Sequence, residues 1–260
     1  MRLRGARPLR NTGRNRGTMP RFQAFGGGAS RGSFSLTNLQ AAWKLNEASG
    51  AQRDDSHGTN HLTNNGTVGQ AAGKLTNAAS FDNNAANYLS IADNAALSMG
   101  NIDFTVVAWI FLTGSGMAQA IVAKGDTSGL FAVEYMLSLN ANGNPNVLFR
   151  VDNGSSSGAT VTSTSTILLN SWVFLVAWHD ATADTLNVQV NDGAVDSAAY
   201  SAGSFDGTNA MHLGGVLEVG VNSLPFTGRI DESSIWKRVL TSAERTSLYN
   251  AGAGISYPFI

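Results

Sequence analysis

Short apolar runs, each about as long as a β-strand and separated by turn-forming residues, constrain the fold of this chain most strongly. Residues 104–112 read FTVVAWIFL, which is typical of a strand buried on both faces. Residues 131–139 alternate larger apolar with smaller or polar residues, and an Asn-rich loop then leads into 147–151, which predicts a β-hairpin. Residues 191–193 read Asn-Asp-Gly, the residues of a tight turn with positive φ. Many short strands with turn signals between them predict an antiparallel β-sandwich.

One helix is expected, near the C-terminus. Thr241 and Glu244 have the spacing of a capping box, and Gly252 can end the helix in the left-handed conformation. The 29 glycines and the charged fraction of 13% also suit a loop-rich all-β chain better than a helical one. All five tryptophans lie in strand patterns, so we expect them in the core rather than at a binding surface: Trp43, Trp109, Trp172, Trp178 and Trp236.

Charge is divided unequally along the chain. The first 46 residues contain nine Lys and Arg and no Asp or Glu; because the whole chain has a formal net charge of −1, the remainder carries −10. Pro8, Pro20 and the scarcity of periodic apolar residues predict an extended arm over residues 1–36, followed by one domain over 37–260. The arm contains seven arginines before its glycine hinge: Arg2, Arg4, Arg7, Arg10, Arg14, Arg16 and Arg21.

An arm of this kind either neutralises phosphates or lies along an acidic protein surface. Only Phe22 and Phe25 are interleaved with the basic residues, which gives little support for base stacking. We therefore expect an identical subunit or an acidic neighbouring protein as its partner, with nucleic acid as the second choice of partner. A solvated tail without a partner is the other alternative. Met19 could instead be the true start of the protein, in which case most of the arm would not exist.

Cysteine is absent, so no disulfide stabilises the domain. No apolar run approaches the roughly 20 residues that a membrane span needs, so no membrane span is expected. No apolar segment follows the N-terminal arginines, so a cleaved signal peptide is not expected either.

An ordered set of short motifs resembles the laminin-G-like, concanavalin A-like jelly-roll family over about residues 38–256. The motifs are Ala42-Trp43-Lys44-Leu45, Asp54-Asp55-Ser56, Phe81-Asp82, Tyr88-Leu89-Ser90-Ile91, the run 104–112, Ser171-Trp172, Val190-Asn191-Asp192-Gly193, Leu213-Gly214-Gly215, Phe226 to Glu232, and the ending 235–252. The resemblance implies two antiparallel sheets packed face to face, with the chain ends near one another. It also implies binding of glycans or proteins at a rim of loops, in some members with Ca²⁺.

Two departures from the family pattern stand out. Val173-Phe174 occupies the place of an expected His-His pair, and Ser233 and Ser234 replace an apolar position. Strict alternation would put Ile230 and Ile235 on opposite faces of one strand, so we predict a β-bulge between them.

The resemblance brings Asp54, Asp55, Asp82 and Asp231 toward one another, and carboxylate oxygens in loops are the ligands that Ca²⁺ requires. These four residues are therefore the candidate ligands of a structural Ca²⁺. The alternative is that Asp54 and Asp82 only hold turns through hydrogen bonds to the backbone.

Catalytic motifs are not expected. A retaining glycosidase on this fold resembles E-x-D-x-x-E, with two carboxylates on one face of a strand, and no glutamate of this chain lies in that pattern. Asp231 and Glu232 are adjacent, so in a regular strand they face opposite sides. The sequence also lacks G-x-S-x-G. We therefore expect a protein that is not an enzyme.

Glycan contacts are expected from aromatic and amide side chains in loops. Tyr200 and Phe205 follow the 191–193 turn, while Asn142 and Asn144 lie in the Asn-rich loop, and all four are candidates. These loops can equally be plain turns.

Three functions remain open from the sequence. The first is a structural or adhesion protein, anchored by its arm to an assembly and displayed at a virion or extracellular surface, because an Arg-rich arm on this body resembles phage decoration or tail proteins with this fold. The second is a free-standing carbohydrate-binding module that binds a cell-surface glycan. The third is a polysaccharide-active glycoside hydrolase.

Overall fold

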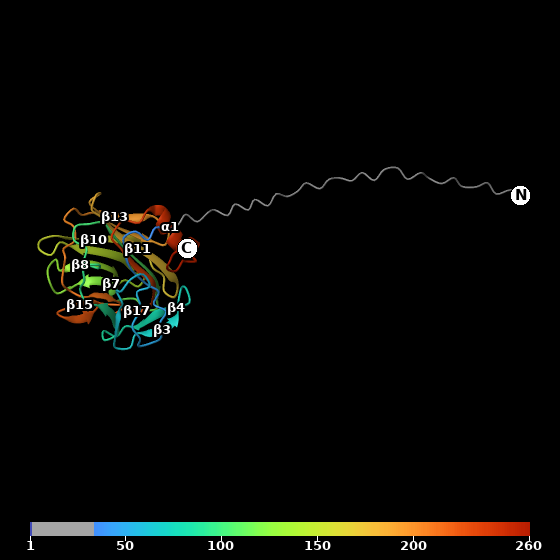
Figure 1. The fold of residues 1–260 in the computed structure, drawn as a ribbon, viewed down its shortest axis with the longest axis horizontal. Coiled ribbons are helices and arrows are strands. Elements are labelled where there is room, and N and C mark those ends of the chain that lie inside the picture. The colour runs from blue at the N-terminus through green and yellow to red at the C-terminus, as the bar shows by residue number, and fades with distance from the viewer. Residues whose placement is uncertain (2–33) are drawn as a thin grey trace. The chain divides into compact units, whose positions relative to one another are not determined.

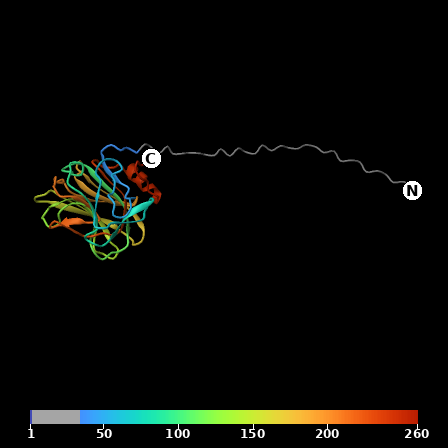
Figure 2. The same cartoon turned by 60° about the horizontal axis from the view of Figure 1, so that its bottom comes forward.

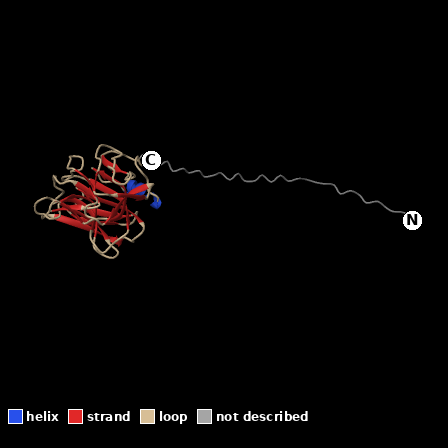
Figure 3. Cartoon of the chain, turned by 90° about the horizontal axis from the view of Figure 1, so that it is seen from below, coloured by secondary structure: helices blue, strands red, loops and turns tan. Residues whose placement is uncertain are grey.

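The computed structural model describes Met1 and residues 34–260. These residues form the expected all-β sandwich with one short C-terminal helix, as the ribbon of Figure 3 shows. Residues 2–33 lie outside the described part, so the seven arginines of the expected arm and its partners are not addressed by the structure. The expected boundary after residue 36 is wrong, because Phe34 and Leu36 pack against the domain. In the described part, no helix is long and apolar enough to cross a membrane.

The first sheet has eight antiparallel strands, with the longest strands at its centre. Figure 1 labels several of them. Their order is β13 (Val195–Ala199), β12 (Thr185–Val190), β11 (Trp172–Asp180), β6 (Phe104–Leu112), β17 (Thr227–Trp236), β4 (Asn77–Asp82) and β3 (Gly69–Ala72), with β1 (Leu39–Trp43) also pairing with β17.

The second sheet has seven strands and contains the expected hairpin, because Met136 pairs with Arg150 and Leu139 with Val147. A separate two-stranded ribbon follows it, formed by β15 (Val216–Glu218) and β16 (Val221–Ser223). The seven strands in order are β10 (Gly158–Thr166), β9 (Asn146–Asp152), β8 (Val133–Leu139), β7 (Gln119–Gly125), β14 (Met211–Leu213), β5 (Tyr88–Ile91) and β2 (Thr63–Asn65).

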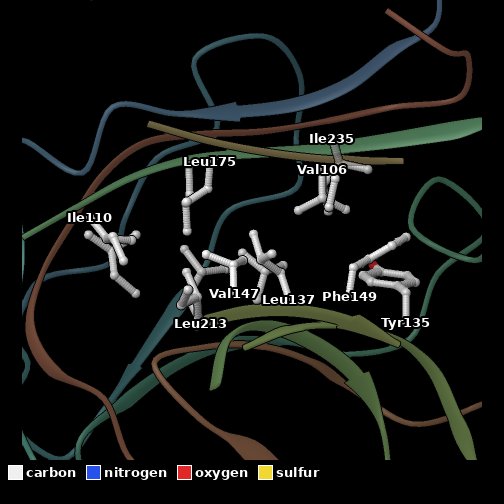
Figure 4. Packing of buried hydrophobic residues seen from close by; sticks show 14 of the residues in the cluster. Val106, Ile110, Tyr135, Leu137, Val147, Phe149, Leu175, Leu213 and Ile235 are labelled. Atoms are coloured by element: carbon white, nitrogen blue, oxygen red, sulfur yellow. The ribbon is translucent and has the colours of Figure 1, made fainter. Parts of the chain in front are cut away.

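The main core lies between the two sheets. Figure 4 shows side chains such as Val106 and Leu175 of the first sheet facing Leu137 and Phe149 of the second. Each such side chain is essentially closed off from solvent and contributes roughly 1.5–3 kcal/mol by burial. The alternation seen in the sequence therefore marks the inner face of each strand.

The predicted bulge in β17 is confirmed. Pairing with β6 shifts register between Asp231 and Ser234, and Glu232 adopts a left-handed φ of 46°. Ile230 and Ile235 consequently both point into the main core, although they are five positions apart, an odd spacing that a regular strand would place on opposite faces.

A second apolar cluster covers the outer face of the first sheet. Helix α1 (Ser242–Tyr249) and the C-terminal segment after it pack there, on the side shown in red in Figure 2. The capping box is confirmed, since the Thr241 hydroxyl accepts from the Glu244 N–H at 3.2 Å and the Glu244 carboxylate accepts from the Thr241 N–H at 2.9 Å. The helix ends before Gly252, because Asn250 already adopts the left-handed conformation that Asn tolerates.

The two ends of the domain meet on this outer face. The Phe34 ring lies 5.3 Å from that of Phe259 and 5.6 Å from that of Trp236. This agrees with the family resemblance, which places the chain ends near one another. Four of the five tryptophans are buried as expected, and Trp172 is the exception, being only half-buried.

Candidate ligand-binding site

Loops gather at the two opposite ends of the sandwich. We call one end the Tyr200 rim, made of loops 153–157, 181–184 and 200–210, and the other the Asn142 rim, made of loops 113–118, 140–145 and 167–171. Strand β9 connects the two rims and has seven residues, so they lie about 20 Å apart at the usual rise per residue. The four residues predicted for glycan binding therefore form two separate pairs rather than one site.

A depression of about 390 Å³ opens at the Tyr200 rim. Its lining comes from all three loops of this rim and the end of β13: Ser157, Asp184, Ala199, Tyr200, Ser201 and Ala202. The depression therefore combines a carboxylate and two hydroxyls with small apolar groups, which is the mixture expected of a site for a polar organic ligand.

Tyr200 connects the loops beneath this depression. Its N–H donates to the Asp184 carbonyl at 2.7 Å, and its hydroxyl donates to the Gly203 carbonyl at 2.9 Å. Burial, followed by the negative charge of Asp152, raises the pKa of Tyr200 to about 12, so the phenol stays neutral. The expectation of a free aromatic platform is wrong in this respect, since Tyr200 is only 5% exposed and supports the site from below.

Loop 153–157 is ordered by one amide. The side-chain Oδ1 of Asn153 accepts from the backbone N–H groups of Ser155, Ser156 and Ser157 at 2.9–3.1 Å. Phe205 lies half-buried against Gly154, where a Cβ would approach its ring to 2.8 Å. Phe205 thus packs behind the loop and does not line the depression.

A buried charge cluster holds the neighbouring loops in place. The Lys124 ammonium lies 2.9 Å from Asp93 and 2.5 Å from Glu134, and it also donates to the Gly207 carbonyl. Glu134 in turn accepts from the Met99 N–H at 2.7 Å. The hydrogen bond from Lys124 lowers the pKa of Asp93. Sequence reasoning missed this cluster, although a Lys and a Glu inside otherwise apolar strand runs were its visible signal.

With this geometry in place, comparison with known proteins identifies the family. Residues 82–244 match the family model described as the concanavalin A-like lectin/glucanases superfamily. The chain belongs to this superfamily. No curated protein matches the chain by sequence.

Several solved structures share this fold. The binding domain of Paraclostridial Mosquitocidal Protein 1 superposes with a TM-score of 0.66 at 16% identity, covering 83% of this chain and 52% of that structure. Domain 4 of AbnA, a GH43 extracellular arabinanase from Geobacillus stearothermophilus in complex with arabinotriose, gives 0.59 at 22% identity, with 80% and 97% covered. The binding domain of botulinum neurotoxin serotype G gives 0.62 at 13% identity, with 83% and 51% covered. The chain thus spans about half the length of the two toxin structures.

Four aspartates were expected from the sequence to be ligands of a structural Ca²⁺. Asp55 accepts from three backbone N–H groups of the 42–60 segment at 2.9–3.0 Å, and Asp231 accepts from three others at 2.7–3.0 Å. Asp82 accepts from the Asn84 N–H and the Asn87 amide, while the exposed Asp54 accepts from Gln52. Asp82 thus holds a turn through a backbone hydrogen bond, which is the alternative that the sequence left open, whereas the Asp54 carboxylate accepts from a side chain instead.

The four aspartates do not fit a calcium site. Within residues 34–260 and Met1, no three acidic or histidine side chains come together as a ligand set. Burial raises the pKa of Asp231 to about 7, although its three backbone hydrogen bonds act to lower it. Calcium binding stays an expectation that the arrangement of these carboxylates does not favour.

At the other end of the domain, Asn142 and Asn144 are both exposed. Their loop is held by Asn140, whose side-chain oxygen accepts from the Asn146 N–H at 3.0 Å, and the Asn142 carbonyl accepts from Gly116 at 3.4 Å. The amides are therefore accessible on an ordered loop, but they lie far from the depression at the Tyr200 rim.

Proposed function

We propose that this protein is a non-catalytic glycan-binding module that binds a neutral oligosaccharide in the depression of the Tyr200 rim. The observation that carries the proposal is that Asp184, Ser157 and Ser201, from three different loops, line the same depression. Hydrogen bonds within loop 153–157 already order it. Sugars present dense, directional hydroxyl groups, and ordered polar side chains bind such groups without a large entropic cost.

The chemistry of the lining favours neutral sugars. The Asp184 carboxylate accepts a hydrogen bond from a sugar hydroxyl, and a hydrogen bond to a charged group contributes about 1.5–3 kcal/mol. The two serine hydroxyls donate or accept as the ligand requires. A sugar carboxylate in the same place would be repelled by Asp184, so acidic sugars are disfavoured.

Domain 4 of the arabinanase supports this class of ligand, since it resembles this chain over nearly its whole length and is described in complex with arabinotriose. Arabinotriose is neutral and rich in hydroxyls, so it is a suitable first probe.

The carboxylates of the cluster behind the rim do not form an accessible catalytic pair. Glu134 is fully buried, and both of its oxygens accept hydrogen bonds from Lys124, Gly207 or Met99. Its role in this proposal is to fix the loops, and no hydrolytic step is assigned to it.

The proposal extends to the arm. Nine basic residues in the first 46, against a net charge of −10 in the rest, support anchoring to an acidic neighbour or an identical subunit in an assembly such as a phage virion, with the module displayed outward at an extracellular surface. Deleting residues 1–33, which stops before Phe34 and its contacts with Trp236 and Phe259, is expected to abolish assembly and leave folding and sugar binding intact. An assembly unaffected by the deletion would contradict the anchoring role.

Calorimetric titration with arabinotriose and a panel of neutral oligosaccharides tests the binding function. Asp184→Ala is expected to weaken binding roughly 10- to 100-fold, the equivalent of one lost charged hydrogen bond. Asp206→Asn, in the same rim but outside the lining, is the matched control and should bind as the unmodified protein does. Equal affinities for both variants, or no binding across the panel, would overturn the proposal.

A further inference from the structure

We propose a second, separate site for an acidic sugar residue on the outer face of the eight-stranded sheet. It consists of Trp172, Phe111 and Arg229, which we call the Trp172 row. Phe111 pairs directly with Trp172 across β6 and β11, and with Arg229 across β6 and β17. Because directly paired residues point to the same face of a sheet, the three side chains form one continuous row over three neighbouring strands.

Contacts within the row are close. The Phe111 and Trp172 rings lie 5.5 Å apart, and the Arg229 guanidinium carbon lies 4.6 Å from the centre of the Phe111 ring. Two aromatic faces and a flat cation are thereby fixed side by side. One guanidinium nitrogen donates to the Ala72 carbonyl at 3.0 Å, which holds the group in place and leaves other N–H donors for a ligand.

The C-terminal segment covers only part of this sheet face. Tyr249 stacks over Trp109 at 5.9 Å, and Phe174 is buried in the same cluster. Two residues further along β6, Phe111 is only half-buried, as are Trp172 and Arg229. The row therefore begins where the cover by α1 and the tail ends.

A second cation lies beside the row. The Lys74 ammonium is 4.6 Å from the centre of the Trp109 ring, and Trp109 shares a face of β6 with Phe111. In the described part of the chain, neither Lys74 nor Arg229 forms an ion pair. Asp231 is the nearby carboxylate, paired with Trp109, but it is fully buried and accepts three backbone N–H groups.

These features together define the ligand. The flat C–H face of a pyranose packs on aromatic rings, and a guanidinium binds a carboxylate through two parallel hydrogen bonds. A uronic acid residue carries both the C–H face and the carboxylate on one sugar ring. A neutral sugar would contact only the aromatic side chains, and a small anion would contact only Arg229 and Lys74. The row lies at the start of β11 and Asp184 lies beyond its end. Strand β11 has nine residues and is therefore about 30 Å long, so this site is distinct from the Tyr200 rim.

Titration of the full chain with tri-galacturonic acid, followed by tryptophan fluorescence and calorimetry, tests the site. Binding is expected, and its methyl ester, which keeps the ring but loses the charge, should bind at least about tenfold more weakly. Arg229→Gln should abolish this preference for the acid, while Arg229→Lys should retain part of it, because Lys keeps the charge without the planar pair of donors.

Trp172→Ala should weaken binding of both the acid and the ester, and Trp172→Phe should restore most of it. The Asp184→Ala variant should bind tri-galacturonic acid normally, which separates this site from the neutral-sugar site. No binding of the acid, or binding that the Arg229 and Trp172 variants leave unchanged in a folded protein, would overturn the proposal even if arabinotriose binds.

Discussion

The Lys124 ammonium lies 2.5 Å from the Glu134 carboxylate, and both side chains are completely closed off from solvent. Lys124→Met removes the cation and leaves the Glu134 carboxylate buried without its partner. Breaking a buried pair in this way costs about 3–5 kcal/mol, so we expect a much lower midpoint of chemical unfolding. The double variant Lys124→Met/Glu134→Gln should recover part of the loss. A single variant as stable as the unmodified protein would contradict the structural role of this pair.

Glu232 gives the domain a specific pH dependence. Burial, with the nearby charge of Asp231, raises the pKa of Glu232 to about 8, and one of its carboxylate oxygens has no hydrogen-bond partner in the described structure. Because the folded state then holds a proton that the unfolded state has lost, the free energy of unfolding should fall from about pH 5 to about pH 9. Glu232→Gln should reduce this dependence, leaving the part that comes from Asp231, whose pKa burial raises to about 7, and should stabilise the domain at pH 9. Urea unfolding at several pH values measures it, and an unchanged slope in the variant would show that another group is responsible.

Asp55 distinguishes turn formation from metal binding. Its carboxylate accepts from the N–H groups of Ala42, His57 and Asn60, so Asp55→Ala leaves three backbone donors without this acceptor. A loss of about 2–3 kcal/mol in stability is expected. The lower melting temperature should be the same in Ca²⁺ and in EDTA. A difference between the two conditions in the unmodified protein would instead support a calcium site.

Gly154 fixes the shape of the loop beside the depression. It has a φ of 78°, and an added Cβ would lie 2.8 Å from the Phe205 ring. Gly154→Ala is therefore expected to cost about 1 kcal/mol or more through the backbone alone and to weaken sugar binding by displacing Ser157. Gly143→Ala is the control, because a Cβ there meets no neighbouring atom. If Gly154→Ala binds sugar normally, the ordering of this loop does not matter for the ligand.

The β17 bulge and the cap of helix α1 depend on residues close together in the sequence, so both could be predicted. The bulge of β17 could be inferred because Ile230 and Ile235 must both be buried and a regular strand would separate them. The capping box could be inferred because the side chains of Thr241 and Glu244 each accept a hydrogen bond from the other residue's backbone N–H within one helical turn.

Surface features depended instead on contacts between distant segments. Tyr200 was expected to be accessible, but its hydroxyl donates to the backbone carbonyls of Gly203 and Ser157. The residues next to Tyr200 in the sequence do not show that the distant loop containing Ser157 folds over it. Trp172 was expected in the core, and it is half-exposed because the C-terminal segment stops short of it. The partners of Lys124 come from three separate segments, so its charge alone could not identify them.

The central claim is that sugar binds between Asp184 and the serines of the Tyr200 rim. Backbone amide shifts of isotope-labelled protein, followed by NMR during titration with arabinotriose, test it most directly. The account predicts shifts confined to residues 153–157, 181–184 and 199–203, with the amides of the Trp172 row unaffected. Shifts concentrated elsewhere on the domain, or none at saturating concentrations of every neutral sugar tried, would contradict it.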